Sequence, residues 1–408
     1  MKILQINSCH YRRGGADVVY LNTGLLLQNH GHSVAYFSSQ DVHNDPCEFN
    51  AYFTFNGNIR EKNTLQKVLS APSYLYNCEA SDKLEKLIKT IKPDVAHVHL
   101  FYGVLTVSIL KILKRYNIPI VHTVHDYRLL CPVKTFLDRN GVICEDCKDK
   151  HYYYCLKKKC SEGNITQSGM VMLEAYLWKY CIDPLDYIDH FIFVSKFSQS
   201  KHCEYDLRFK EKSSQLYNFV PSPVNRAKST KGSYFLYFGR LSDEKGIKTL
   251  LLAFSETTYN LKIAGMGPLV DVVKRYEQTN ENINYAGFQT GEKLQKLILN
   301  ASFVVIPSEW YENNPMSIIE SFALQKPVMG ANIGGIPELI TNDINGYLFN
   351  TCNIGSLVRT LKEAKNISDQ KYIDLANSAW EFAQQKFDSE IYYRNLLNIY
   401  KNVIENKR

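Results

Sequence analysis

Short apolar blocks that alternate with helix-length segments are the feature that most limits how this chain can fold. The first half carries five such blocks, at 2–8, 32–39, 94–100, 118–126 and 190–195. Each is a continuous apolar run without regular polar alternation, which is typical of strands buried on both faces of a parallel sheet. Helices on both faces then give a doubly wound α/β layer.

The same alternation restarts in the second half, after a stretch rich in Pro, Ser and Asn at 216–233. Its apolar blocks lie at 234–240, 261–267, 283–288, 301–308 and 326–335. A polar stretch between two repeating patterns marks a domain boundary, which we place near Val224. The sequence therefore predicts two Rossmann-like α/β domains, at 1–223 and 224–385, with ligand loops facing a central cleft.

The last segment, 386–408, has apolar residues at helical spacing. An amphipathic helix needs a surface to cover, and we expect this one to pack back on the N-terminal domain.

Composition excludes several classes of protein. Of 408 residues, 45% are apolar and 22% are charged, which is ordinary for a globular protein and excludes disorder. No run of about 18 apolar residues predicts a membrane span, and the N-terminus lacks the pattern of a signal peptide. We expect a cytoplasmic protein. The net charge of +7 permits an anionic membrane surface or a phosphate-bearing substrate, but falls short of a nucleic-acid signature.

Two glutamates separated by seven residues form the strongest local motif. Glu312 follows the apolar block at 301–308, and Asn314-Pro315 then predicts a helix start, with Asn314 as N-cap and Pro315 as first helical residue. Glu320 falls beyond the first turn of that helix. Ionised carboxylates only accept hydrogen bonds, so they suit hydroxyl-rich ligands such as sugars and ribose. The start of that helix offers free N–H groups to phosphates, so we expect Asn314, Pro315 and Met316 to lie at the donor.

A basic loop follows the block at 234–240 and carries Arg240 and Lys245. Fixed cationic donors of this kind can stabilise the negative charge that develops on a leaving diphosphate. No two aspartates in the chain stand two residues apart, so the chain has no Asp-x-Asp motif of the kind that holds a divalent metal ion. We expect the two cations to replace a metal, and predict that catalysis requires no cofactor.

The Glu312 and Glu320 pair, with its preceding strand and its proline, resembles the E-x7-E signature of retaining glycosyltransferases, family 4. The basic loop resembles a second motif of that family. The resemblance implies the GT-B fold, donor-sugar hydroxyls on Glu312, ribose on Glu320, and diphosphate on Arg240 and Lys245. It also implies that the leaving diphosphate accepts the acceptor proton, so Glu312 binds and does not attack.

His125-Asp126 ends the block at 118–126 and resembles the His-Asp pair of the same family. The resemblance places His125 near the donor sugar, where we expect it to position substrate, and puts Asp126 on the acceptor side. The histidines at 97, 99 and 122 are expected to be strand residues with local partners.

Three glycine sites follow strands and precede predicted helices: Gly14-Gly15, Gly265 with Gly267, and Gly334-Gly335. Glycine lets a backbone turn sharply and approach a ligand, so we predict that the first two sites help bind the donor. A dehydrogenase fingerprint is excluded at Gly265, because its third glycine would fall on Val270.

Five of the eleven cysteines fall between residues 131 and 160. The C-x2-C pair with distant partners has the spacing of a structural zinc site, with reduced thiols and a disulfide as the alternatives. Four ligands suffice, so one of five is surplus, either Cys131 or Cys155. Similar cysteine-bearing insertions occur in some bacterial polysaccharide glycosyltransferases of this family. The candidate ligands are Cys131, Cys144, Cys147 and Cys160, with Cys155 as substitute.

The expected function is transfer of a sugar, with retention, from a UDP or GDP type donor to a glycan or polyprenyl-linked acceptor in surface polysaccharide synthesis. Lysines 157–159 and nearby tyrosines add the hypothesis of peripheral binding to an anionic membrane. A sugar-nucleotide epimerase of the same fold is the nearest alternative. A zinc-ribbon nucleic-acid-binding protein is a second alternative, but it leaves the second half of the chain unexplained.

Overall fold

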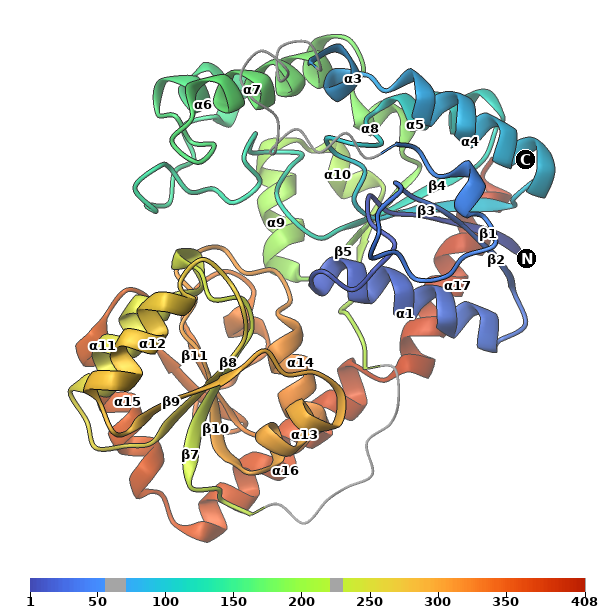
Figure 1. The fold of residues 1–408 in the computed structure, drawn as a ribbon. Coiled ribbons are helices and arrows are strands. Elements are labelled where there is room, and N and C mark those ends of the chain that lie inside the picture. The colour runs from blue at the N-terminus through green and yellow to red at the C-terminus, as the bar shows by residue number, and fades with distance from the viewer. Residues whose placement is uncertain (56–70, 221–229, 408) are drawn as a thin grey trace. The chain divides into compact units, whose positions relative to one another are not determined.

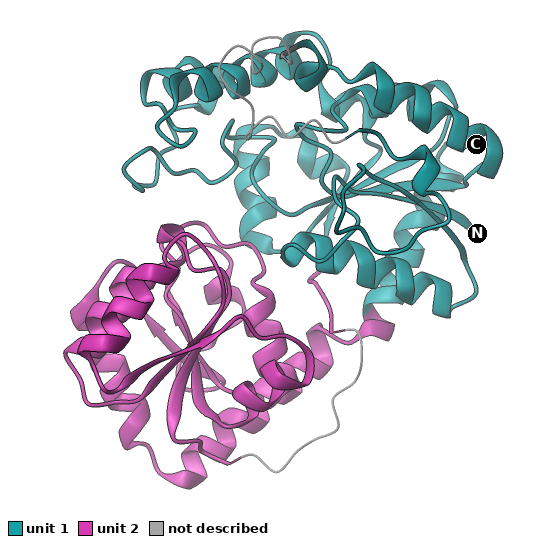
Figure 2. Cartoon of the chain, in the orientation of Figure 1, with its two compact units in different colours: residues 1–216, 392–408 teal, residues 217–391 magenta. Residues whose placement is uncertain are grey.

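The computed structural model describes residues 1–55, 71–220 and 230–407, which form two compact α/β units. Unit 1 comprises Met1–Leu216 and Tyr392–Arg408, and unit 2 comprises Tyr217–Ile391 (Figure 2).

Unit 1 contains a six-stranded parallel sheet in the order β2-β1-β3-β4-β5-β6. The strands β1 and β3 to β5 are apolar and largely buried, because helices cover both faces (Figure 1). Their bounds are Lys2–Ile6 (β1), Ser33–Phe37 (β2), Val95–Val98 (β3), Ile120–Val124 (β4), His190–Phe193 (β5) and Ser213–Gln215 (β6).

The α-helices of unit 1 connect these strands, and α17 adds a return from the end of the chain. Their bounds are Gly15–Asn29 (α1), Ala71–Leu75 (α3), Cys78–Ile91 (α4), Ser108–Arg115 (α5), Tyr153–Lys157 (α6), Ile165–Tyr180 (α7), Pro184–Tyr187 (α8), Lys196–Tyr205 (α9), Arg208–Glu211 (α10) and Ser389–Glu405 (α17). Short 3-10 turns occupy Asn50–Tyr52 (η1) and Lys148–Lys150 (η3).

Unit 2 contains a second six-stranded parallel sheet, in the order β12-β11-β10-β7-β8-β9. This is the Rossmann strand order. Successive strands are added outward in one direction from β7 and in the other from β10, and such sheets bind ligands at the point between these two strands where the order reverses. The bounds are Tyr234–Phe238 (β7), Leu261–Ala264 (β8), Ile283–Gly287 (β9), Ala301–Ile306 (β10), Val328–Ala331 (β11) and Gly346–Phe349 (β12).

Helices cover both faces of the second sheet as well (Figure 1). The α-helices are Ile247–Ser255 (α11), Val270–Thr279 (α12), Gly291–Leu299 (α13), Met316–Ala323 (α14), Ile354–Asn366 (α15) and Asp369–Lys386 (α16). The 3-10 turns are Asp243–Lys245 (η4) and Ile336–Glu338 (η5). The predicted fold class, two Rossmann-like parallel-sheet halves, is thus confirmed.

The change between units falls at Tyr217, earlier than the boundary expected near Val224, which lies outside the described residues. The backbone after Leu216 already belongs to unit 2, because the N–H of Asn218 donates to Asn314 Oδ1 at 2.8 Å and the N–H of Val220 donates to the carbonyl of Phe387 at 2.9 Å.

The C-terminal helix begins at Ser389, not at 386, because α16 continues to Lys386. From Tyr392 onward the chain belongs to unit 1. There Lys407 pairs with Asp189 at 2.6 Å, and the Tyr392 hydroxyl lies 3.2 Å from Thr23 Oγ1.

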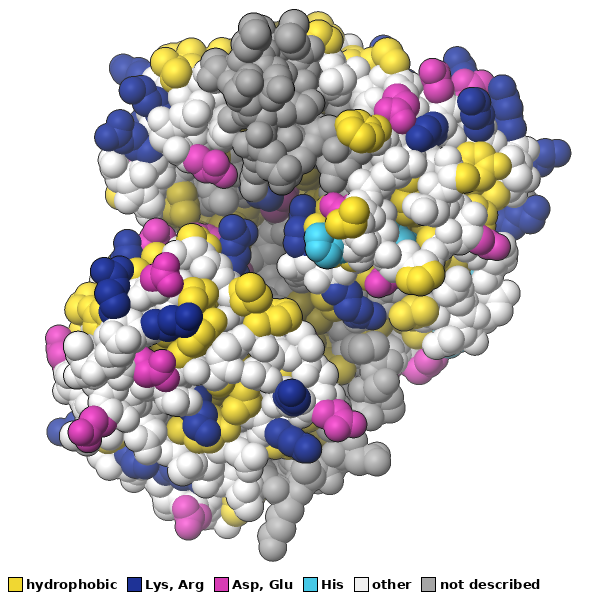
Figure 3. Space-filling model, in the orientation of Figure 1, with side chains coloured by type: hydrophobic (Ala, Val, Ile, Leu, Met, Phe, Trp, Pro, Cys, Tyr) yellow, Lys and Arg dark blue, Asp and Glu magenta, His cyan; other side chains and the backbone are white. Residues whose placement is uncertain are grey.

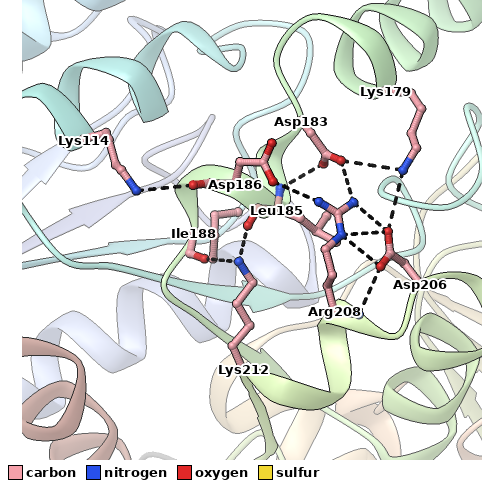
Figure 4. A network of polar contacts seen from close by, with 9 residues as sticks. All are labelled: Lys114, Lys179, Asp183, Leu185, Asp186, Ile188, Asp206, Arg208 and Lys212. Carbon is pink, nitrogen blue, oxygen red and sulfur yellow. Dashed lines mark hydrogen bonds and ion pairs between the residues drawn. The ribbon is translucent and has the colours of Figure 1, made fainter. Parts of the chain in front are cut away.

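Ion pairs fix two short helices of unit 1, α8 and α10, and the segment that follows β4. Arg208 binds Asp183, Asp186 and Asp206 at 2.7 to 2.9 Å, which ties α8 to α10 (Figure 4). In the interior, Arg128 after β4 pairs with Glu174 of α7, and both side chains are buried. Within the parts of the chain that are described, no helix is long and apolar enough to cross a membrane.

Candidate active site

The loops after β7 and β10 meet at the strand reversal of unit 2 and bring the two main predicted motifs together. Lys245 Nζ lies 2.6 Å from Glu312 Oε1, although 67 residues separate them in sequence. Ser308 Oγ donates to the same carboxylate oxygen at 2.7 Å, and the Lys245 ammonium lies 5.0 Å from the ring centre of Trp310. A carboxylate and an ammonium are therefore held side by side at the ligand edge of the sheet.

The environment of Glu312 keeps its carboxylate ionised. Its side chain is only 5% exposed, and this burial alone would raise its pKa. The nearby Lys245 charge and the hydrogen bonds from Lys245 and Ser308 outweigh that effect and lower the pKa of Glu312 below its usual value. A buried carboxylate whose negative charge is already paired with a cation is a poor nucleophile, but it is still a good hydrogen-bond acceptor.

Close glycine contacts hold the Glu312 loop in place. Gly334 adopts φ +60, and a Cβ there would lie 2.5 Å from the Glu312 carbonyl oxygen. The N–H of Gly335 donates to that same oxygen at 2.6 Å. The Gly334-Gly335 pair therefore positions the first glutamate through its backbone.

Replacing Gly334 by Ala is expected to cost about 3 kcal/mol of unfolding free energy and to shift Glu312, because left-handed strain and a backbone clash add. Gly287→Ala is the matched control in the same unit, since Gly287 has φ +71 and nothing within 4 Å of its Cβ position. That control should cost only about 1 kcal/mol from backbone strain. Chemical denaturation of both variants measures the difference, and equal losses would contradict the clash.

The helix after the Glu312 loop starts one residue later than predicted. Pro315 is the N-cap with extended backbone, and Met316 is the first residue of α14. Asn314 is not the cap, because its Oδ1 accepts from the N–H of Asn218. Its Nδ2 is buried and has no hydrogen-bond partner within the described residues, a cost that a ligand acceptor would relieve.

Glu320 lies in the second turn of α14 and is half-buried. Burial raises the pKa of its carboxyl to about 7. The second glutamate therefore changes its charge near neutral pH, unlike Glu312.

Arg240 directly follows Gly239 at the end of β7 and is exposed. The glycines at 265 and 267 let the loop after β8 lie against the Arg240 loop, since Cβ atoms there would meet the carbonyl oxygens of Gly239 and Leu241 at 1.9 and 2.3 Å. These glycines have a packing role beside the basic loop. Contact with a donor stays a prediction.

In unit 1 the predicted residues also follow strands at one sheet edge. Gly14 is the N-cap of α1 and Gly15 its first residue, after β1. His125 and Asp126 follow β4 and are half-buried. Burial lowers the pKa of His125 to about 3 and raises that of Asp126, so the imidazole is neutral at physiological pH.

Comparison with known sequences now places the chain in a family. Residues 13–222, just over half of the chain, match Glycosyltransferase Family 4, and residues 222–381 match Glycosyl transferases group 1. The chain belongs to glycosyltransferase family 4. It is thus an enzyme of the glycosyltransferase class, as predicted.

Two relatives show how far the sequence similarity of this glycosyltransferase extends. An uncharacterized 42.6 kDa protein from the cps region of Klebsiella pneumoniae is 25% identical over 356 residues, 83% of this chain and 87% of that protein. The lipopolysaccharide 1,2-N-acetylglucosaminetransferase of Salmonella typhimurium is 27% identical over 179 residues, 38% of this chain and 47% of that enzyme.

Solved structures confirm the GT-B fold. Anabaena Alr3699/HepE in complex with UDP and glucose has a TM-score of 0.67 at 17% identity, covering 98% of this chain and all of that one. Sucrose-phosphate synthase from Thermosynechococcus elongatus reaches 0.70 at 16% identity, with 99% of each chain covered.

The cysteine-rich insertion of this glycosyltransferase lies between β4 and α7. Four of its thiols, at 131, 144, 147 and 160, are close enough to interact electrostatically. Burial has the largest effect in raising the pKa of Cys147, and the neighbouring Cys131, Cys160 and Cys144 raise it further. The described residues contain no group of three or more Cys, His, Asp or Glu that could hold a metal ion. All five cysteines are free thiols.

Two residues of the site, Ser308 and His99, were not predicted from the sequence. Ser308 contacts Glu312, and His99 contacts His125 with its Nδ1 2.9 Å from His125 Nε2. Ser308 follows an apolar strand, which is a signal, but a serine there is too common to single out. His99 at the end of β3 stands next to β4 in the sheet, so strand order would have found it.

Proposed function

We propose that this glycosyltransferase moves a sugar, with retention, from a nucleoside diphosphate sugar to a glycan or polyprenyl-linked acceptor, and uses no metal in catalysis. The contact between Lys245 and Glu312 supports this most directly. The bond that breaks joins a sugar carbon to a phosphate oxygen, so an acceptor for sugar hydroxyls and a cation for phosphate must stand side by side. They lie 2.6 Å apart.

Different residues of the chain then bind different parts of the donor. Glu312 accepts hydrogen bonds from sugar hydroxyls, while Lys245 and Arg240 stabilise the charge that grows on the diphosphate. Glu320 accepts from the ribose, and Asn314 Nδ2 supplies a further donor from the same loop. No carboxylate attacks, because Glu312 is held in its ion pair and the leaving diphosphate takes the acceptor proton.

The relatives support the proposed donor class and pathway. Anabaena HepE was solved with UDP and with UDP-glucose, and relatives include a lipopolysaccharide transferase and putative colanic acid transferases. We therefore propose a UDP or GDP type donor and a role in surface polysaccharide synthesis.

A thermal-shift screen with UDP, GDP, ADP and their sugars tests the donor. The correct nucleotide at 100 times its Kd adds about 2.7 kcal/mol of stability. Transfer should then persist in EDTA, and NMR of the product should show the donor's anomeric configuration. Inversion, loss of activity in EDTA, or rapid epimerisation of donor without acceptor would each contradict the proposal.

Nucleic acid is not among the proposed partners. On the face shown in Figure 3, the Lys and Arg side chains form separate groups interrupted by acidic and uncharged ones. A continuous basic stripe, which nucleic-acid binding usually requires, is absent from the described residues on that face.

Structural zinc in the cysteine insertion stays a prediction from the sequence. Purified protein is expected to carry one zinc ion per chain by mass spectrometry, and Cys147→Ser is expected to lose it. Cys203→Ser, outside the insertion, is the control that should retain the metal. Zinc-free wild-type protein would contradict the prediction and leave the insertion with reduced thiols.

Peripheral binding to an anionic membrane is the last part of the proposal. Helix α7 exposes Ile165, Leu173 and Tyr180, which share one helical face, and Lys157 lies nearby in sequence on α6. Sedimentation with anionic liposomes, reversed by salt, is expected for wild-type protein and weakened in Leu173→Ser. Equal sedimentation with neutral and anionic liposomes would contradict the electrostatic part.

A further inference from the structure

A chain of hydrogen-bonded side chains runs inside unit 1 from His125 to helix α17. His125 Nε2 lies 2.9 Å from His99 Nδ1, and His99 Nε2 lies 3.2 Å from Gln5 Oε1. The amide nitrogen of Gln5 lies 3.5 Å from the Tyr400 hydroxyl and 3.4 Å from His97 Nδ1. Apart from His125, these side chains are fully buried. The chain is therefore shielded from competing water.

The members come from distant parts of the sequence. Gln5 lies on β1, His97 on β3 and His99 directly after it, and these strands are neighbours in the sheet. Tyr400 comes from α17, which returns to unit 1 after the whole of unit 2 (Figure 1). The Tyr400 hydroxyl lies 2.7 Å from His97 Nδ1, and His97 Nε2 lies 2.7 Å from Thr123 Oγ1.

Elementary donor and acceptor rules decide where the protons sit. The oxygen of the Gln5 amide can only accept, so His99 Nε2 carries a proton and donates it. Burial lowers the pKa of His99 well below its usual value, so the ring is neutral and its Nδ1 has a lone pair. The proton between the two histidines therefore belongs to His125 Nε2. His125 is neutral as well, which leaves the lone pair on its Nδ1.

The hydrogen bonds at the end of this series farthest from His125, those of Tyr400 and His97, hold the Gln5 amide in this orientation. The Tyr400 hydroxyl donates to His97 Nδ1 and accepts from Gln5 Nε2, while His97 Nε2 donates to Thr123. Turning the amide over would reverse the donors along the chain and move the His125 proton to Nδ1. Gln5 is thus the residue on which the protonation pattern depends.

We propose that Gln5, His99 and Tyr400 are positioning residues that keep the proton of His125 on Nε2, so that Nδ1 accepts a hydrogen bond from a substrate hydroxyl. An acceptor that is already oriented needs no reorganisation when a sugar hydroxyl arrives. The role of His125 in this inference rests on the proposed function, but its protonation pattern does not.

NMR of the full chain with ¹⁵N-labelled histidine tests the pattern without any substrate, and His125→Gln assigns the signal. Wild-type protein is expected to carry the His125 proton on Nε2. In Gln5→Met the buried N–H of His99 would lose its acceptor, so its proton should move to Nδ1 and that of His125 to its own Nδ1. In transfer assays, kcat should fall about 10- to 100-fold with little change in KM for the donor.

Tyr392→Phe is the matched control, because it removes another buried hydroxyl from the same helix. The Tyr392 hydroxyl contacts Thr23 and is not one of the hydrogen-bonded groups that lead to His125. It should leave the His125 signal and kcat unchanged. Tyr400→Phe, which frees the far end of the Gln5 amide, should give a smaller change of the same sign as Gln5→Met.

Three results would overturn the inference. They are a wild-type His125 protonated on Nδ1, a His125 signal in Gln5→Met or Tyr400→Phe that matches wild type, and a kcat that stays at the wild-type value while the signal moves. The first two are read without substrate, so they stand even if the proposed donor proves wrong.

Discussion

Replacing Lys245 by Met is expected to lower the rate of sugar transfer by about a hundred- to a thousandfold, as removal of one fixed charge-stabilising donor does in other enzymes. The same change should cost stability, because it leaves the buried Glu312 carboxylate with Ser308 but without its cation. Breaking such a pair on one side costs about 3 kcal/mol when fully buried, and Lys245 is 24% exposed, so about 2 kcal/mol is expected.

The loss of stability in Lys245→Met should depend on pH in a known direction. In the folded wild type the pKa of Glu312 is lowered, so its contribution is present above its unfolded pKa and is lost as pH falls through the folded value. The difference between variant and wild type should therefore be largest near neutral pH and shrink toward pH 4. Urea denaturation across this range measures it.

Two further variants separate charge stabilisation from simple damage. In Lys245→Met/Glu312→Gln the unpaired charge is gone, so stability should partly return while transfer stays low. Lys248→Met is the matched control, because Lys248 pairs with Asp243 at 2.7 Å but both side chains are more than half exposed. Its stability and rate should equal those of wild type. A double variant with restored transfer would refute the diphosphate role of Lys245.

Ten of the twelve strands in the described residues could be predicted because each is a continuous apolar block. The two that were missed lie at sheet edges. β6 consists of Ser213–Gln215, whose polar side chains carry no strand pattern, and it is defined only by its pairing with β5. β12, at Gly346–Phe349, is four residues long and pairs with β11 at the edge of the sheet. β6 is only half-buried, so no apolar run marks it, whereas β12 is largely buried and was missed because it is short.

The site divides in the same way between local and long-range information. The spacing of Glu312 and Glu320 and the basic loop are local, and the sequence predicted them, although the start of α14 was placed one residue early. Contacts such as Gln5 with Tyr400 join residues 395 positions apart, and no local pattern encodes them. They depend on the strand order and on the return of α17, which only the folded chain shows.

Glu320→Gln is expected to stabilise the protein above neutral pH, the opposite of what Lys245→Met does. The folded pKa of Glu320 is raised from 4.5 to about 7 by burial, and no cation among the described residues offsets this effect. Its favourable contribution is complete below the unfolded pKa and is lost as pH rises through the folded one. At pH 8 the glutamine removes that penalty, worth about 1 to 3 kcal/mol, and at pH 4 it should change nothing.

The same substitution should weaken nucleotide binding, because only the ionised carboxylate accepts strongly from ribose hydroxyls. Binding to wild type is then expected to strengthen between pH 6 and pH 8, and in Glu320→Gln to be about tenfold or more weaker at pH 8 with that rise lost. Glu312→Gln should instead impair sugar recognition and turnover more than nucleotide affinity. Calorimetric titration with nucleoside diphosphates measures both, and Glu381→Gln, an exposed glutamate of α16, is the control.

A gain in stability together with a loss of nucleotide affinity would be strong evidence for a ligand role. A residue kept only for folding would not hold its carboxyl half-buried without a cation, at a pKa near 7. The cost of burying an unpaired carboxylate is retained at sites where a bound ligand supplies a partner for the charge. If Glu320→Gln were instead less stable than wild type at pH 8 and bound nucleotides equally well, Glu320 would be a packing residue and the ribose assignment would be wrong.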